Sequence, residues 1–153
     1  MSLVIDRPSL LVDAPGTMLL AEVETTIARE GLTLGLSAVP AQTVAAWLAA
    51  GAPGAPSSFA DPADHLLAGL TATLASGSIL EILPGPRRAV GPDLVPLFVG
   101  AHGRFGTIER AWLRVHLASA RPVRLPLPEV VLDPPVSDDE EALLARIAVE
   151  LNR

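Results

Sequence analysis

Three glycines interrupt an apolar stretch over residues 97–115 at intervals of three, and they restrict the possible fold more than any other feature. Glycine alone tolerates positive φ and close backbone approach, so Gly100, Gly103 and Gly106 predict a tight loop between two elements. After this loop, residues 110–117 alternate between apolar and polar types, which is typical of a half-buried strand. The stretch therefore predicts a short helix, a glycine loop whose backbone N–H groups are open to an anion, and a strand.

The predicted strand has two different faces. The buried face is assigned to Ala111, Leu113, Val115 and Leu117, and the other face to Arg110, Trp112, Arg114 and His116. Because Trp and Arg are enriched among the residues that anchor protein interfaces, the second face is either an exposed sheet surface or a surface that receives a partner. The pattern favours neither alternative over the other.

Two helices are predicted before the glycine loop. An apolar run at 10–12 reads as a strand ended by the turn Asp-Ala-Pro-Gly, and a helix follows over 18–30. Thr17 is the expected N-cap of this helix, and Gly31 stands just past its C-terminus. Residues 43–50 predict a short, alanine-rich helix that ends at the next glycine.

The remaining apolar runs complete a layered α+β fold. Residues 66–75 and 79–83 flank a Ser-Gly turn and predict a hairpin that is buried on both faces. With the strands at 10–13 and 107–117 they are expected to form an antiparallel or mixed sheet covered by the two helices. This domain spans residues 1–121.

The C-terminal part differs in character. Residues 122–153 begin with a proline-rich linker, in which helix is excluded, and end with an amphipathic helix. Ser137 and Glu140 have the spacing of a capping box, and Leu144, Ile147, Ala148 and Leu151 form the apolar stripe of this helix.

Composition excludes several classes of function. The chain of 153 residues carries a net charge of −6, which argues against nucleic acid or an anionic membrane as partner. It has no Cys, and its three His residues have no metal-ligand spacing, so no metal site and no catalytic residue are assigned. His102 in the glycine loop is the only candidate worth testing, and its alternative is a solvated loop imidazole. Arg87 and Arg88 either contact phosphate or form a solvated pair in a loop. The N-terminus is not typical of a signal peptide, and a cytoplasmic protein is expected.

A longer pattern around the glycines is more specific. Residues 93–113 contain Asp-Leu, Leu-Phe-Val-Gly, a second Gly and Gly-Thr-Ile at set intervals. This string resembles the "DL..L.VGS.GTLGVIT...L" signature of FAD-linked oxidases, the vanillyl-alcohol oxidase and p-cresol methylhydroxylase family, which includes glycolate oxidase flavin subunits. The resemblance runs over residues 10–117. It implies the second of the two lobes that clasp FAD, and we expect no first lobe or substrate-binding cap in this chain.

The resemblance also assigns cofactor-binding residues. It implies that one group lies along the flavin and another near the adenine and pyrophosphate: Thr43, Val44, Ala45 and Ala46, and Gly103, Arg104, Phe105, Gly106, Thr107 and Ile108. The family has two glycines where this chain has Ala45 and Ala46, and the added methyl groups would obstruct a close ligand. Arg104 and Phe105 stand where Thr and Leu are usual; the cation could meet phosphate or fill the site.

Two functions therefore stay open. In one, the chain is a structural or interaction module with at most weak FAD binding and no activity of its own. In the other, it is the FAD-binding subunit of a glycolate-oxidase-like enzyme and is completed by a partner chain. We expect a homodimer or a partner subunit, because the side of the lobe that faces FAD would otherwise be bare.

Overall fold

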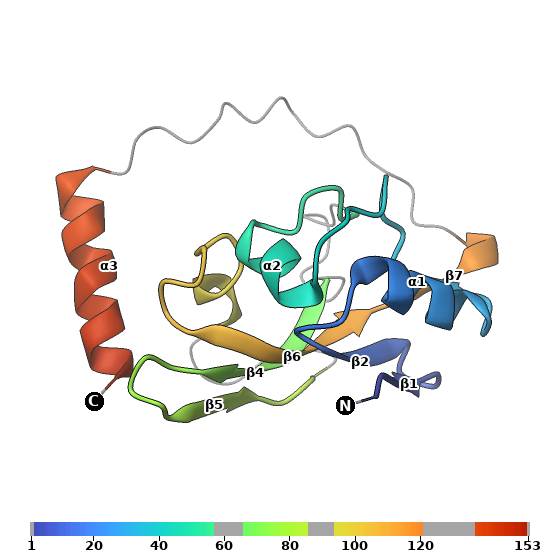
Figure 1. Ribbon diagram of the computed structural model, residues 1–153, viewed down its shortest axis with the longest axis horizontal. Coiled ribbons are helices and arrows are strands. Elements are labelled where there is room, and N and C mark those ends of the chain that lie inside the picture. Colours follow the sequence, from blue (N-terminus) through green and yellow to red (C-terminus); the bar gives the residue numbers. More distant parts are fainter. Residues whose placement is uncertain (1, 57–65, 86–93, 121–136, 153) are drawn as a thin grey trace.

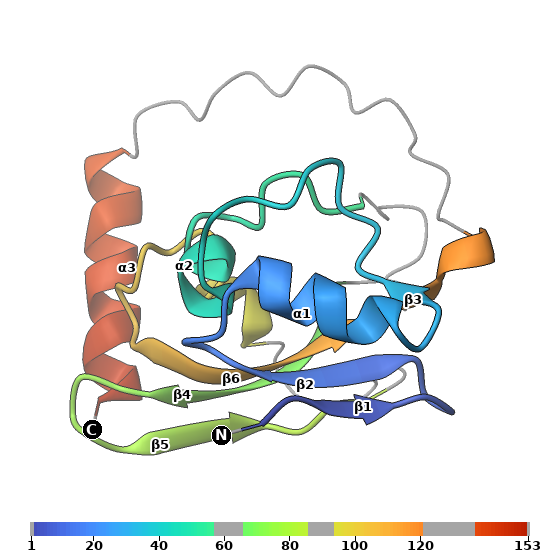
Figure 2. The same ribbon diagram turned by 45° about the vertical axis from the view of Figure 1, so that its right-hand side comes forward.

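In the computed structural model, the described residues form a five-stranded antiparallel sheet and a small two-stranded one, with two helices on one face of the larger sheet and a third helix beside one end (Figures 1 and 2). The structure describes residues 2–56, 66–85, 94–120 and 137–152. The elements are β1 (Val4–Asp6), β2 (Leu11–Pro15), α1 (Leu20–Ala28), β3 (Leu32–Thr33), α2 (Val44–Ala49), β4 (Leu67–Thr73), β5 (Ile79–Ile82), the 3-10 turn η2 (Val95–Leu97), β6 (Thr107–Arg114), β7 (His116–Leu117), the 3-10 turn η3 (Ala118–Ala120) and α3 (Asp138–Leu151). The expected α+β class is confirmed.

The main sheet is organised around β6. Its strand order is β1-β2-β6-β4-β5, and every neighbouring pair is antiparallel. The two long central neighbours, β2 and β4, flank β6 on either side. The strand that follows the glycine loop is therefore the middle of the sheet, and α1 and α2 cover the face above it (Figure 2).

The predicted faces of the central strand are confirmed over most of its length. Ala111, Leu113 and Val115 are buried, and Trp112 on the other face is partly exposed. Leu117 is the exception, with 44% of its surface exposed, and its assignment to the buried face was wrong. The reason is that β7 leaves the main sheet and pairs with β3 in a separate two-stranded sheet.

The entry into α1 differs from the prediction. Asp13 lies inside β2 and pairs with β6, so the strand continues to Pro15 where a turn was expected. The helix starts at Leu20, and Thr17 does not cap it. The backbone of the segment before α2 replaces a side-chain cap, because the amide of Leu20 donates to the carbonyl of Gln42 at 3.0 Å. The positive φ of +70° at Gly31 agrees with its expected place after the helix.

The second helix forms as its sequence indicates. The Thr43 hydroxyl accepts a hydrogen bond from the amide of Ala46 at 3.3 Å and caps the N-terminus of α2. Gly51 follows the helix with a φ of +87°. The inward side of α2 carries Trp47, which is fully buried and donates from Nε1 to the Pro53 carbonyl at 3.0 Å.

The predicted hairpin is present, but its burial is not as expected. Gly77 in the turn between β4 and β5 has a φ of +82°. The first half of β4 is buried, whereas Ile79 in β5 is 74% exposed. Burial of both strands on both faces was wrong, because β5 is the edge of the sheet and has no strand beyond it among the described residues.

Helix α3 packs against the end of the sheet where β4 turns into β5 (Figures 1 and 2). Ser137 and Glu140 form the predicted capping box. The predicted stripe lies on the core side and is partly buried: Leu144, Ile147, Ala148 and Leu151. The amide of Ser76 donates to Asn152 Oδ1 at 2.8 Å and joins the end of α3 to the hairpin turn. Among the described residues, no helix is long and apolar enough to cross a membrane.

Candidate functional site

The loop between η2 and β6 has the conformation that its glycines predict. Gly100, Gly103 and Gly106 have φ values of +77°, +80° and +151°, and His102 between them has a φ of +50°. A methyl group on Gly106 would lie 2.5 Å from the carbonyl oxygen of Thr73. This glycine is therefore required by close approach to β4 as well as by its backbone angle.

The loop is held against the C-terminus of α2. The amides of Gly100 and His102 donate to the carbonyls of Leu48 and Ala49, each at 3.0 Å. These carbonyls lie at the end of α2, where a helix leaves acceptors unsatisfied. The glycine loop thus completes the helix, and its position relative to α2 is set by backbone hydrogen bonds.

These bonds correct, for four of the loop amides, the expectation that the loop amides are open to an anion. Besides the two amides that reach α2, the amide of Arg104 donates to Ala101 at 3.0 Å and that of Gly106 to Gly103 at 3.3 Å. Four of the loop amides therefore donate within the protein and are not open to an anion. Within residues 98–106, the backbone amides that make no hydrogen bond with a described residue are those of Val99, Ala101, Gly103 and Phe105.

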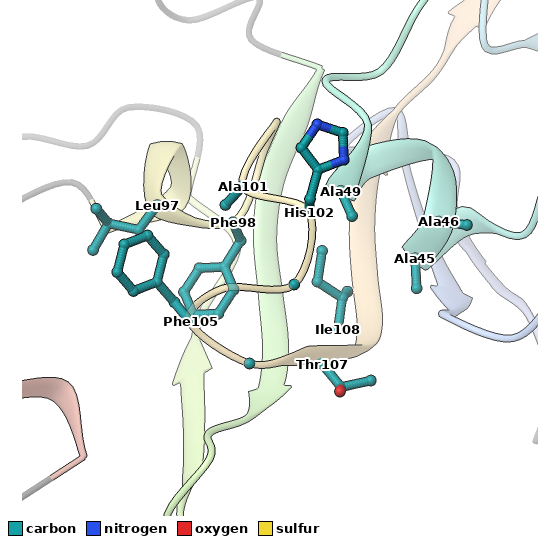
Figure 3. Close-up of a pocket in the computed structure, with 12 residues that line it drawn as sticks. Ala45, Ala46, Ala49, Leu97, Phe98, Ala101, His102, Phe105, Thr107 and Ile108 are labelled. Carbon is teal, nitrogen blue, oxygen red and sulfur yellow. The ribbon is translucent and has the colours of Figure 1, made fainter. Parts of the chain in front are cut away.

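A pocket of about 210 Å³ lies between α2 and the glycine loop (Figure 3). It brings together seven of the residues predicted to bind a cofactor: Ala45, Ala46, Gly103, Phe105, Gly106, Thr107 and Ile108. The two predicted groups, about sixty residues apart in the chain, therefore face one space. Its lining is mainly apolar, and His102 is the titratable side chain among the described residues that line it.

Three predicted residues do not line this pocket. Thr43 caps α2, and Val44 is fully buried in the core. Arg104 points to α3, where its guanidinium forms an ion pair with Glu141 at 3.0 Å. The structure therefore gives each of these side chains another contact.

Other lining residues were not assigned to a cofactor from the sequence: Ala49, Leu97, Phe98, Ala101 and His102. Ala49 lies one helical turn after Ala45, so the helical period of residues 43–50 could have indicated it. Leu97 and Phe98 carry no such signal, because their place depends on how η2 packs beside the loop.

Gly16 marks the place where three elements meet beside the pocket. Its amide donates to Glu109 in β6 at 2.7 Å, and its carbonyl accepts from Ala45 in α2 at 2.9 Å. A methyl group here would lie 2.1 Å from the carbonyl oxygen of Ile108. The end of β2 thus fixes the start of α2 over β6, a close approach that the sequence reasoning did not identify.

The site offers little charge. Within the described residues no group of His, Asp and Glu could hold a metal ion. The well-formed pair of Arg110 and Asp13, 2.7 Å apart, joins β6 to β2 on the sheet face opposite Leu113. Arg87, Arg88 and His65 lie outside the described residues. The arrangement suits an apolar or aromatic group better than a highly charged one.

Comparison with solved structures identifies the fold. The chain resembles two structures of alkyldihydroxyacetonephosphate synthase in different crystal forms, with TM-scores of 0.61 and 0.57. The sequence identities are 22% and 21%, over 74% of this chain in both cases. The chain corresponds to 20% and 21% of those chains, about a fifth of their length.

Comparison of sequences finds no relative of this chain among family profiles or curated proteins. The structural likeness therefore establishes the fold and leaves the function to be inferred from the site.

Proposed function

We propose that this chain is a module with the fold of the second FAD-binding lobe of an FAD-linked oxidase, and that by itself it neither holds FAD tightly nor oxidises a substrate. Alkyldihydroxyacetonephosphate synthase, whose fold it shares, is an enzyme of the FAD-linked oxidase family. This likeness supports a lobe of the same kind.

The main support for this proposal is that side chains of the protein leave little room in the pocket. Ala45 and Ala46 both line the space, at positions where the resembled family has glycine. Phe105 in the loop is only 2% exposed and occupies the floor of the loop as a core residue. The remaining volume of about 210 Å³ is below the ~300 Å³ at which pockets for small organic ligands usually begin.

The backbone of the loop supports the same conclusion. Dinucleotides gain much of their affinity from backbone amides of glycine loops and helix N-termini around the pyrophosphate. Here four loop amides already donate within the protein. In the resembled family FAD lies between two lobes, so a single lobe would make only part of the contacts.

Titration of FAD followed by flavin fluorescence tests the proposal. We expect a colourless preparation and a dissociation constant above about 100 μM, which corresponds to less than about 5.5 kcal/mol. A yellow preparation, or submicromolar binding by the chain alone, would overturn the proposal.

A matched pair of variants tests the role of the methyl groups. Ala45→Gly removes a methyl from a residue that lines the pocket, whereas Ala50→Gly changes an alanine at the end of the same helix that does not line it. We expect the first to tighten FAD binding by about tenfold, ~1.4 kcal/mol, and the second to leave it unchanged. Equal affinities for both variants would show that the methyl group is not the obstruction.

One observation favours a second candidate, an FAD-binding subunit completed by a partner. Seven predicted cofactor residues line one pocket that opens to the surface. If a chain or segment with the facing lobe completes the site, co-expression with such a chain from a neighbouring gene yields a yellow complex. Failure of any such pair to retain FAD would leave the non-binding module as the function.

Exposed apolar side chains on α3 support self-association as a further proposal. Leu143 and Val149 on α3 are 53% and 60% exposed, although they belong to the helix that packs beside the site. Large apolar side chains gathered at a surface are typical of interfaces. A homodimer that involves α3 is therefore proposed for the isolated chain.

A further inference from the structure

Strand β5 is an edge of the main sheet, and within the described residues it lacks the usual protection of an edge. Natural edge strands are short or carry charges, prolines or bulges that keep other strands away. The opposite edge, β1, has three residues and is followed by Arg7 and Pro8. Residues 79–83 instead read Ile-Leu-Glu-Ile-Leu, and their one charge is that of Glu81. Figure 1 shows β5 as the outer strand beyond β4.

The side chains of residues 79–83 alternate in exposure. Ile79 and Leu83 are 74% and 73% exposed, and Glu81 between them is exposed as well. Leu80 and Ile82 lie on the other face, where they pack against the core. The Glu81 carboxylate makes no hydrogen bond or ion pair with any described residue. One face of this edge therefore presents two large apolar side chains to solvent, on either side of a single carboxylate.

The hydrogen bonds of the hairpin show which backbone groups of β5 point away from the sheet. The amide of Leu74 donates to the carbonyl of Ser78 at 2.9 Å, next to the turn. Hydrogen-bonded pairs recur at every second position of an antiparallel ladder, so the even-numbered residues of β5 exchange the bonds with β4. The N–H and C=O groups that are left pointing to the edge, without a partner among the described residues, are those of Ile79, Glu81 and Leu83.

The order of side chains in this segment is symmetric about Glu81, which makes the segment complementary to a copy of itself. In an antiparallel pair centred on Glu81, Ile79 of one copy stands opposite Leu83 of the other, and Leu80 opposite Ile82. All the backbone groups that point to the edge then meet in hydrogen-bonded pairs. A two-fold axis relates the copies, as in most homodimers. A partner of different sequence would not use this symmetry, so a second copy is the occupant that the segment fits.

The charge at the centre opposes the contact. In this register Glu81 stands opposite Glu81 of the other copy, and like charges directly opposite on neighbouring strands are destabilising. The contact is also limited to residues 79–83, so it is smaller than the interfaces of tightly bound dimers. We therefore expect the pairing to be reversible and to depend strongly on the charge at this one residue.

We infer that residues 79–83 form a contact between two copies of this chain, which joins their main sheets into one continuous sheet with Glu81 at the two-fold axis. The inference rests on the self-association proposed above and names a contact for it. This contact is separate from the exposed apolar side chains of α3. It requires no ligand in the pocket.

A charge exchange at Glu81 tests the register. Dimers of the unaltered chain place two carboxylates opposite each other, and dimers of Glu81→Lys place two ammonium groups there, whereas a mixed dimer brings opposite charges together. We expect the mixture to dimerise about two- to fivefold more tightly than either chain alone, the range of one cross-strand pair. Sedimentation equilibrium at equal total concentration measures this gain. Mixing with Glu22→Lys, which changes an exposed acid of α1, is the control and should give no gain.

A pair of proline substitutions tests the backbone hydrogen bonds. Ile79→Pro removes an amide that points to the edge, and proline is tolerated at the first residue of an edge strand because it breaks no ladder bond there. We expect it to abolish dimerisation and to leave the far-UV circular dichroism unchanged. Val4→Pro is the matched control, since Val4 is the exposed first residue of the other edge strand. It should leave the dimer intact.

The outcomes separate this contact from the other proposals. A mixture with Glu81→Lys that gains no more than the control, or a dimer that Ile79→Pro leaves intact, would overturn the inference. If Leu143→Asp abolishes that remaining dimer, self-association stands and its contact lies on α3. If the unaltered chain and Glu81→Gln are both monomers at every concentration, self-association fails together with the contact. FAD titration of Ile79→Pro tests the non-binding module independently of all these results.

Discussion

Replacement of Gly16 by alanine tests how the site is assembled. The added methyl group would lie 2.1 Å from the carbonyl oxygen of Ile108 and 3.2 Å from the Cβ of Ala45. The first of these atoms belongs to the backbone of the central strand, which cannot turn aside as a flexible side chain can. Either β2 or β6 must therefore move.

The size of the effect follows from the contacts that such a movement breaks. Overpacking of this kind costs about 1–3 kcal/mol. Gly16 also makes backbone hydrogen bonds to Glu109 and Ala45, at 2.7 and 2.9 Å, and each contributes roughly 0.5–1.5 kcal/mol. We expect the free energy of unfolding to fall by roughly 2–5 kcal/mol, allowing for partial relaxation.

Urea denaturation followed by far-UV circular dichroism measures this change. Gly31→Ala is the control, because Gly31 also needs a special backbone with a φ of +70° but has no atom within 4 Å of an added methyl group. Its cost should be only that of the left-handed conformation, about 1–2 kcal/mol. If Gly16→Ala destabilises the protein no more than Gly31→Ala, the close meeting of β2, β6 and α2 is not as described.

Three further predictions concern the strand, the helix and the assembly. Leu113→Ala should lower the free energy of unfolding by about 2–5 kcal/mol, because Leu113 is fully buried. Leu117→Ala, at a position that is 44% exposed, should lower it by less than about 1 kcal/mol. Equal losses of the two variants in urea denaturation would contradict the assignment of the strand faces. Hydrogen bonds from the amide and then the hydroxyl of Ser137 hold the pKa of Glu140 below its ordinary value of 4.5. The stabilisation that these bonds give α3 is therefore present above pH 4.5 and is lost as the pH falls through the lowered pKa. If the helicity of Glu140→Gln decreases on acidification as much as that of the unaltered chain, this prediction is refuted. Sedimentation at micromolar concentration should show a dimer, and a strict monomer without a partner would count against self-association.

The elements of the fold could be predicted from the sequence because most of their signals are local. The glycines at positive φ, the Thr43 cap and the capping box of α3 depend on residues a few positions apart. The alternation in β6 reported its buried face correctly for the same reason, since successive side chains of a strand point to opposite sides.

Errors occurred where a distant segment replaced a local signal. Thr17 has the side chain of an N-cap, but the amide at the start of α1 bonds to Gln42 instead. Leu117 continues the alternation of β6, but the chain has already left the sheet to pair with β3. Neither partner lies within reach of a short sequence pattern.

The candidate site shows the same division. Its residue types were predictable, because glycines at fixed spacing and a short capped helix are sequence features, and the structure brings most of the predicted residues to one pocket. The position of Arg104 outside that pocket could not be predicted from the sequence. Its partner Glu141 is separated by 37 positions and belongs to a helix whose docking depends on tertiary packing.

The sequence by itself determined the glycine turns, the capping box of α3 and the apolar face of most of the central strand, since each follows from steric and hydrogen-bonding preferences of neighbouring residues. Only the tertiary structure decided that the loop amides donate to α2, that β5 is an edge, and that α3 engages the one arginine of the loop. These features require two segments distant in the chain to meet. Their free energy belongs to the contact between segments, which neither segment encodes alone.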